Sequence, residues 1–312
     1  MMWLAMFWIS LKKAGKAGLC QGQRLTLTIL AIASMVLLPG QAIAAPASLQ
    51  LGLDALQQQD FATAVEYFDQ AIQQHDSLEV AYGQRCLAHL MLNQPEQSVQ
   101  DCSAAIAVNP AYPKLRFYRG LAHYRLSQYT AAVVDLTQHL QAQPDDARAY
   151  YNSGLAKFAQ GNVSSAIADY HQALTYAADL NPVERSNLYN DLGVAYLASG
   201  VKPAETLLAL DQAVALDTSD TRAYFNRGCA CREQGHYAAA LQDFDRVIAL
   251  NPHHAETYFN RGAVKQQLGN LDGAMTDYQT AFTQFQQQGN LDGAQRAKLR
   301  LQQMQQPRQA IG

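Results

Sequence analysis

Two stretches decide the fold of this chain: YFNRGCACREQGHYAAALQDFDRVIALNP at residues 224–252 and YFNRGAVKQQLGNLDGAMTDYQTAF at residues 258–282. Each has a tyrosine four positions before a glycine, and the two glycines are 34 residues apart. The same pattern recurs outward along the chain, with a small residue at Gly52, Cys86, Gly120, Gly154, Gly193, Gly228 and Gly262. The successive spacings are 34, 34, 34, 39, 35 and 34 residues. A fixed period of this length predicts a stack of repeated units, each of which buries its apolar face against its neighbours.

Each copy predicts two helices joined by a tight turn. The small residue lets the second helix approach the first, and an alanine does the same from the facing helix: Ala64, Ala132, Ala166, Ala240 and Ala274. The turn needs a left-handed residue, for which glycine is favoured and asparagine is next. That position holds Asn93, Gly161, Gly200, Gly235 and Gly269. Prolines then end three of the second helices, because proline cannot continue a helix: Pro110, Pro144 and Pro252.

These residues resemble the tetratricopeptide repeat (TPR) family. Tyr224 and Tyr258 match its first aromatic position, Phe244 and Tyr278 its second, and Pro252 its closing proline. The resemblance covers about three quarters of the chain, in seven copies in phase. It implies an all-α fold, a right-handed superhelical α-solenoid of about seven helical hairpins with a C-terminal capping helix.

The predicted organisation follows from the period. A signal peptide occupies residues 1–44, and the capping helix and a short tail occupy 286–306 and 307–312. The repeats lie at 45–78, 79–112, 113–146, 147–180, 187–220, 221–254 and 255–285. Five extra residues fall within 179–186, and the turn at 200–203 is one residue longer than the others. We expect a change of superhelical pitch there rather than a domain boundary.

Four repeats carry a matched pair of opposite charges. An arginine directly precedes the small residue and an aspartate follows 16 positions after the arginine: Arg85/Asp101, Arg119/Asp135, Arg227/Asp243 and Arg261/Asp277. Because these positions lie across the interface of an antiparallel hairpin, we predict four half-buried ion pairs within repeats. The other interpretation is four solvated charges that happen to recur, which would contribute only about 0–1 kcal/mol each.

The N-terminus has the order of a secretory signal. Residues 1–44 contain four lysines and arginines and no acidic residue, and an apolar run of 14 residues at 25–38 precedes an Ala-Ile-Ala site at 42–44. This order predicts export with cleavage after Ala44, to a periplasm or an equivalent lumen. The run is short for a spanning helix, which needs about 20 residues. A retained membrane anchor is the open alternative, and with it membrane association through this segment.

Charge and motifs exclude several function classes. Removal of residues 1–44 changes the formal net charge from −3 to −7, whereas nucleic-acid binding requires a basic stripe. No nucleophile elbow, phosphate loop or zinc motif occurs. His253 and His254 are adjacent in a predicted turn but lack a third ligand at a recognisable spacing. We therefore predict no enzyme activity, no cofactor and no metal site.

The second repeat alone places cysteine at two facing positions of the hairpin. Cys86 occupies the small-residue position and Cys102 the second aromatic position. In the tetratricopeptide arrangement these positions face each other, so in an oxidising compartment a disulfide is plausible. Two buried free thiols, packed as small hydrophobic groups, are the other interpretation.

The family resemblance also implies a binding surface, the concave groove lined by first helices. The predicted groove residues are Lys114, Phe117, Leu121, Tyr124, Arg148, Tyr151, Asn152, Leu155, Phe158, Asn190, Arg222, Phe225, Asn226, Arg232, Phe259 and Asn260. They combine aromatic rings with amide and basic groups, which suits an apolar peptide that also carries a carboxylate. Some of the rings could instead pack only against the next hairpin.

These features predict an exported scaffold that binds peptide segments of partner proteins and aids the assembly or maintenance of an envelope or membrane-associated complex. Two alternatives stay open: a structural protein that self-assembles, so that a homo-oligomer is not excluded, and an accessory subunit of an enzyme. The sequence names no partner.

Overall fold

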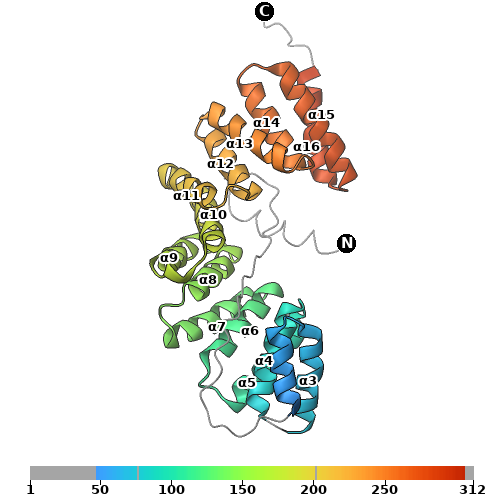
Figure 1. Ribbon diagram of the computed structural model, residues 1–312. Coiled ribbons are helices and arrows are strands. Elements are labelled where there is room, and N and C mark those ends of the chain that lie inside the picture. The colour runs from blue at the N-terminus through green and yellow to red at the C-terminus, as the bar shows by residue number, and fades with distance from the viewer. Residues whose placement is uncertain (1–46, 76, 201, 306–312) are drawn as a thin grey trace, which may run out of the picture. The chain divides into compact units, whose positions relative to one another are not determined.

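The structure is a computed structural model that describes residues 47–75, 77–200 and 202–305. Apart from one short 3₁₀ turn, every element in these ranges is an α-helix (Figure 1). The predicted signal peptide and the tail at 307–312 lie outside the described residues. Within the described ranges, no helix has the length and apolar character needed to cross a membrane.

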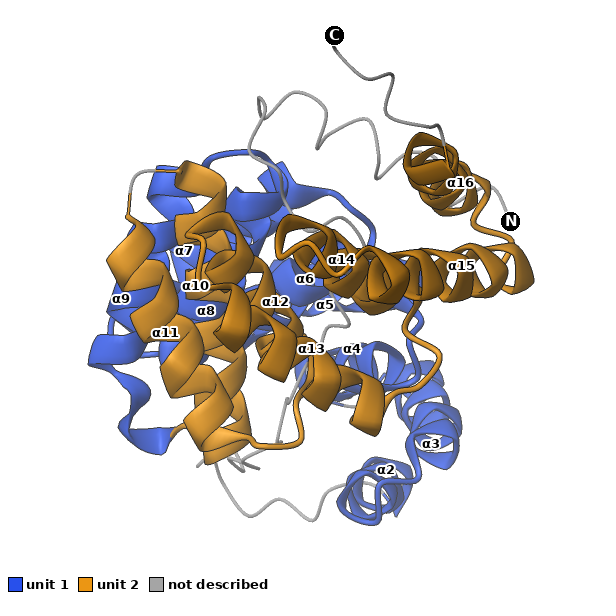
Figure 2. Cartoon of the chain, turned by 90° about the horizontal axis from the view of Figure 1, so that it is seen from above, with its two compact units in different colours: residues 1–11, 30–179 blue, residues 12–29, 180–312 orange. Residues whose placement is uncertain are grey.

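The chain divides into two compact units, one ending at Asp179 and the other beginning at Leu180 (Figure 2). This division falls within the predicted insertion. The change of superhelical pitch stays a prediction.

The first unit contains four helical hairpins, in which each first helix packs on the second helix of its own hairpin and on the first helix of the next. A 3₁₀ turn, η1 (Ala177–Asp179), follows the last hairpin. The helices are α2 (Ala47–Gln57), α3 (Phe61–Gln73), α4 (Leu78–Met91), α5 (Pro95–Val108), α6 (Pro113–Arg125), α7 (Tyr129–Ala142), α8 (Ala147–Ala159) and α9 (Val163–Thr175).

The second unit contains three hairpins and a final helix, α16, which packs on α15. Three apolar residues bury α16 against the last hairpin: Ala294, Ala297 and Leu301. The helices are α10 (Pro182–Ser199), α11 (Pro203–Leu216), α12 (Thr221–Glu233), α13 (Tyr237–Leu250), α14 (Ala255–Gln267), α15 (Leu271–Gln287) and α16 (Leu291–Gln305). The all-α prediction, a stack of hairpins with a capping helix, is confirmed.

One small-to-large contact closes six of the seven hairpins. A Cβ added at Gly154 would lie 2.5 Å from the ring of Tyr170, and one added at Gly228 would lie 2.8 Å from the ring of Phe244. The same contact joins Gly52 to Phe68, Gly120 to Leu136, Gly193 to Leu210 and Gly262 to Tyr278. The predicted alanines of the facing helix have no exposed surface. The residue must therefore be small, because a large side chain 16 or 17 positions later packs directly against it.

The turn between helices is left-handed in every repeat. The glycines at this position have positive φ, from 66° at Gly200 to 81° at Gly161, as predicted. Asn93 follows at 57°. Gln59 and Ser127 take the same conformation at 59° and 58°, although neither residue favours it. The hairpin geometry therefore imposes this turn whatever residue is present.

The four predicted Arg–Asp pairs all form, and each is bidentate. In the last of them, Arg261 donates from Nε and Nη2 to the two oxygens of Asp277 at 2.9 and 2.7 Å. The aspartates are almost completely buried and the arginines are half-buried. The interpretation of these charges as freely solvated is therefore wrong. The hydrogen bond to Asp243 raises the pKa of Arg227, against the opposing effect of burial.

Each of these arginines also reaches back to the preceding repeat. Nη1 of Arg227 contacts Asp211 at 2.8 Å, and Nη1 of Arg261 contacts Asp245 at 2.5 Å. Arg85 contacts Asp69 in the same way, but Arg119 meets Ser103 at 3.1 Å. The contacted residue always lies 16 positions before the arginine. Each arginine therefore ties its own hairpin together and joins it to the hairpin before.

Candidate functional site

Polar side chains on three successive first helices of the second unit, five of them predicted groove residues, are joined in pairs by hydrogen bonds. Asn190 on α10 accepts a hydrogen bond from Asn226 on α12 at 2.8 Å. Arg232, also on α12, donates to Asn260 on α14 at 2.9 Å. Arg222, at the start of α12, donates to Asn187 on α10. We call these residues the amide row: Asn187, Asn190, Arg222, Asn226, Arg232 and Asn260.

Further hydrogen bonds hold two members of the row in place, Asn260 through a backbone carbonyl and Arg222 through a carboxylate side chain. Asn260 Nδ2 donates to the carbonyl of Glu256 one turn earlier at 2.8 Å. Arg222 is held by Asp220, whose side chain also caps the start of α12 through the backbone amide of Arg222 at 2.9 Å. The four asparagines of the row are almost completely buried, and their hydrogen bonds join neighbouring first helices.

The two predicted aromatic residues of this unit lie on the same helices, but each ring packs against the second helix of its own hairpin. Phe225 has no exposed surface, and its ring lies 6.1 Å from that of Phe244 and 5.0 Å from that of His254, between centroids. Phe259 lies 5.4 Å from Tyr278 and is covered by the guanidinium of Arg296 at 5.0 Å. Phe225 is therefore a ring that packs within the stack of hairpins, as the alternative interpretation allowed.

In the first unit the predicted residues lie on α6 and α8. The ring of Tyr151 is half-buried and lies 6.0 Å from Tyr170, the large residue of its hairpin. Phe117 packs on His139, and Tyr124 on Tyr129, at centroid distances of 5.3 and 5.5 Å. Asn152 donates to the carbonyl of Arg148 at 2.8 Å, as Asn260 does to that of Glu256. The other predicted residues on these helices are Lys114, Leu121, Leu155 and Phe158.

Sequence reasoning missed three residues that belong to this surface. Asn187 stands six positions before Gly193, as Arg222 does before Gly228, but only basic residues were sought there. Glu256 holds that position in the last repeat and is bound by Arg296 of α16. Burial raises the pKa of Glu256 to about 7, against the opposing effect of Arg296. The end of the row therefore has a carboxylate where three other repeats have a cation.

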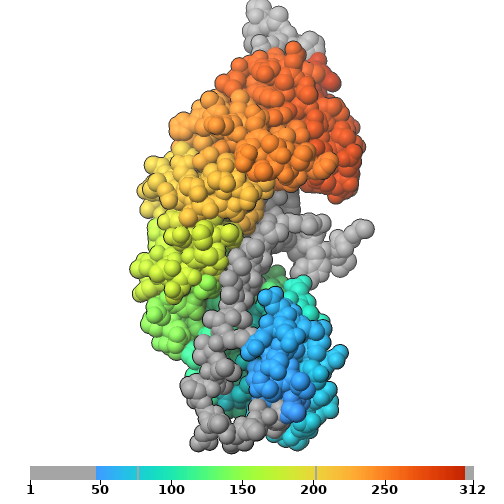
Figure 3. All heavy atoms as spheres, viewed as in Figure 1, coloured from blue at the N-terminus to red at the C-terminus, as the bar shows by residue number. Residues whose placement is uncertain are grey.

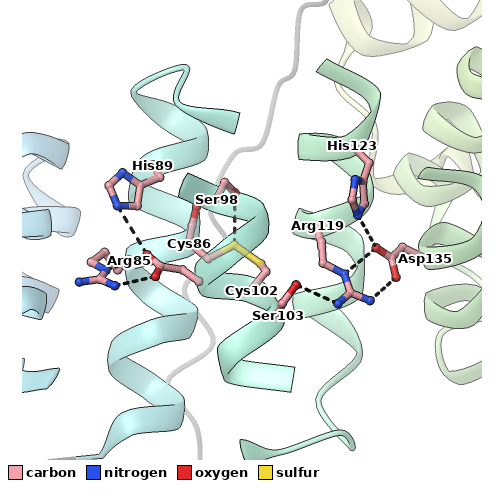
Figure 4. The surroundings of a disulfide bond; sticks show 10 residues. Arg85, Cys86, His89, Ser98, Cys102, Ser103, Arg119, His123 and Asp135 are labelled. Atoms are coloured by element: carbon pink, nitrogen blue, oxygen red, sulfur yellow. Dashed lines mark hydrogen bonds and ion pairs between the residues drawn. A yellow bond between two sulfur atoms is a disulfide. The ribbon is translucent and has the colours of Figure 1, made fainter. Parts of the chain in front are cut away.

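The cysteines of the second repeat are joined. The sulfur atoms of Cys86 and Cys102 are 1.99 Å apart, and the two Cα atoms are 5.3 Å apart (Figure 4). The bond spans the interface of α4 and α5 at the positions that hold glycine and a large side chain elsewhere. Ser98 lies beside it, with Oγ 3.3 Å from the sulfur of Cys86. The disulfide thus replaces the small-to-large contact of the other hairpins.

Within the described residues, no group of three histidine, cysteine or acidic side chains is arranged to hold a metal ion. The candidate site consists of amide, basic and aromatic side chains on first helices.

Comparison with known proteins identifies the repeats. Family models described as Tetratricopeptide repeat match residues 49–90, 84–147, 135–182, 221–254 and 255–292. No curated protein matches the chain.

Solved structures of similar fold include the TPR protein YrrB, described as having an unusual peptide-binding site. It is 23% identical, with a TM-score of 0.53 over 64% of this chain and 98% of that one. PilF of Pseudomonas aeruginosa is 18% identical, with a TM-score of 0.59 over 72% and 97%. A TPR protein of Parabacteroides merdae is 15% identical, with a TM-score of 0.59 over 80% and 97%. At these identities the likeness concerns the fold alone. With the hairpin contacts and the matched models together, the chain belongs to the tetratricopeptide repeat family.

Proposed function

We propose that this protein is an exported, non-enzymatic scaffold that binds peptide segments of partner proteins on the first helices of its repeats. The amide row is the observation that carries this proposal. Its side chains run across three successive first helices and are hydrogen-bonded to one another. The four asparagines are almost completely buried, whereas the side chains of Arg222 and Arg232 are 23% and 24% exposed. An extended peptide has matching donors and acceptors along its backbone, so it could take over these hydrogen bonds.

The chemistry of the surrounding residues narrows the partner class. Arg222 and Arg232 lie at opposite ends of α12, on either side of the amides. Basic groups beside amides favour a segment with at least one carboxylate, since charge-assisted hydrogen bonds are about twice as strong as neutral ones. The half-buried aromatic rings on α8 of the first unit, Tyr151 and Phe158, add apolar contact area.

The place of action follows from the N-terminal sequence. A basic segment, an apolar run and an Ala-Ile-Ala site support export and cleavage after Ala44. An exported scaffold with peptide partners would aid the assembly or maintenance of an envelope or membrane-associated complex. N-terminal sequencing of protein from its native compartment tests this point. A first residue of Ala45 supports cleavage, whereas intact residues 1–44 in the membrane fraction would show an anchor.

Capture of partners from the exported compartment tests the binding surface. We expect Tyr151→Ala combined with Phe158→Ala to weaken capture of the principal partner about tenfold, which corresponds to about 1.4 kcal/mol. Val134→Ala is the matched control, because Val134 is an exposed apolar residue on a second helix, α7. Circular dichroism verifies that both variants are folded. Equal capture by the folded double variant and by wild type would refute the assignment.

A further inference from the structure

The first and last helices that the structure describes carry exposed faces of opposite charge. In a repeat protein each unit contacts only its neighbours, so among the described residues the first and last helices have a neighbouring repeat on one side only. Here α2 packs on α3 and α4, and α16 packs on α15. Figure 3 shows side chains of the first hairpin in blue and of the last helices in red, both at the surface.

The outer face of α2 has one line of side chains that are exposed, apart from Asp54, which is half-buried. Its residues are spaced three and four apart, so they share one face of the helix: Ala47, Gln50, Leu51, Asp54 and Gln58. Leu51 has 44% of its surface exposed, and Gln50 donates to Asp54 at 2.8 Å. The helices α2 and α3, with the cap residue Asp60, contain four carboxylates and no lysine or arginine. We call this line the head face.

The outer face of α16 has the same pattern with the opposite charge. The exposed line consists of Leu291, Gln295, Lys298, Leu299 and Gln302. Leu299 is 45% exposed, almost the same fraction as Leu51. The helix contains Arg296, Lys298 and Arg300 against a single acidic residue, Asp292. A capping helix normally presents a polar outer face, which two exposed leucines contradict. We call this line the tail face.

We propose that the tail face of one copy docks on the head face of a second copy, with Leu299 against Leu51 and Lys298 near Asp54. Both faces present an exposed leucine, glutamines and a charge, and the charges are complementary. This inference goes beyond the peptide-binding function and uses none of its residues. Head-to-tail contact between different faces does not close on itself unless a ring forms, so the copies add one after another. A contact between two single helices is small, so the association is weak.

Sedimentation velocity on the full chain tests the proposal up to about 0.5 mM, a range that detects affinities weaker than micromolar. We expect the wild type to form dimers and then larger species as the concentration rises. Leu51→Asp and Leu299→Asp should each shift this association to at least about tenfold higher concentration, the factor given by about 1.4 kcal/mol. Leu208→Asp is the matched control: Leu208 is 63% exposed on the second helix α11 and should change nothing.

A mixture of the two variants tests directly whether the head face binds the tail face. Leu51→Asp leaves the tail face intact, and Leu299→Asp leaves the head face intact. An equimolar mixture should therefore form a one-to-one dimer that grows no further. The proposal is overturned if the wild type stays monomeric over the whole range. It is equally overturned if wild-type association stops at two, if the two variants associate as wild type does, or if their mixture does not dimerise. Loss of peptide binding in other variants leaves this result unaffected, so the two proposals fail separately.

Discussion

The disulfide between Cys86 and Cys102 should contribute strongly to the free energy of unfolding of the first unit, and its removal tests this. The two residues are 16 positions apart. In the chain-entropy model, closing a loop of this length stabilises the folded state by about 3 kcal/mol. We therefore expect reduction to lower the free energy of unfolding of the first unit by about 3 kcal/mol and to lower its melting temperature.

A second variant separates the covalent bond from the packing. Elsewhere the same two positions hold a glycine and a large residue, as in Gly52/Phe68 and Gly228/Phe244. Cys86→Gly combined with Cys102→Phe should restore that contact without a disulfide. Cys86→Ala combined with Cys102→Ala should lack both and be the least stable of the three proteins. Urea denaturation with and without reductant measures each difference.

The reasoning fails under two results. One is that both Cys86 and Cys102 are alkylated without prior reduction, in wild-type protein that was never exposed to a reducing cytosol. The other is a reductant effect of equal size in the Gly/Phe variant, which has no bond there to break. Cys229, which is disulfide-bonded, and Cys231, a buried free thiol, are present in all three proteins, so their contributions cancel in the comparison.

Three further predictions concern the hairpin contacts and the end of the amide row. Gly228→Ala should destabilise by about 1–3 kcal/mol in urea denaturation, because the added Cβ would lie 2.8 Å from Phe244; a stabilised variant would show that the ring can move. Ser103→Asp should raise the free energy of unfolding by up to about 1 kcal/mol at low salt, and with it the melting temperature. The reason is that it gives Arg119 the second carboxylate that Arg85, Arg227 and Arg261 have. An unchanged melting temperature at low salt would contradict this. Burial raises the pKa of Glu256 to about 7 from 4.5, so the folded state holds the proton more tightly and wild-type stability should fall as the pH rises from about 4.5 to 7. In Glu256→Gln the free energy of unfolding should fall by about 3 kcal/mol less over this pH range, which is the energy that corresponds to the pKa shift. Parallel pH profiles of the two proteins would refute this.

The period and the hairpin residues predicted the fold because each depends on local chemistry. The left-handed turn favours glycine or asparagine, and the sequence shows these residues at five of seven turns. Gln59 and Ser127 do not indicate a left-handed turn, because there the packing of the hairpin determines it. The contacts of each arginine to the preceding repeat were missed for a similar reason. Their partner varies between aspartate and serine, and its position depends on how one hairpin packs on the next.

The candidate site was predictable to the level of the helix face but not of the single side chain. A spacing rule placed Phe225 on the same row as Tyr151, yet Phe225 is enclosed by Phe244 and His254. Its surroundings come from the second helix of its own hairpin and from the turn that follows, which a single position cannot reveal. The amide row was likewise invisible as a network, because it joins residues 28 to 36 positions apart.

Site-specific photocrosslinking in the native compartment tests the central claim most directly. A photoreactive phenylalanine analogue is placed at Tyr151 or Phe259 on first helices, and at Val134 or Leu208 on second helices, one position of each kind in each unit. The account predicts that a partner protein is crosslinked from the first-helix positions and not from the second-helix positions. Crosslinks that form only from Val134 and Leu208 would contradict it and would place the binding surface on the opposite helices.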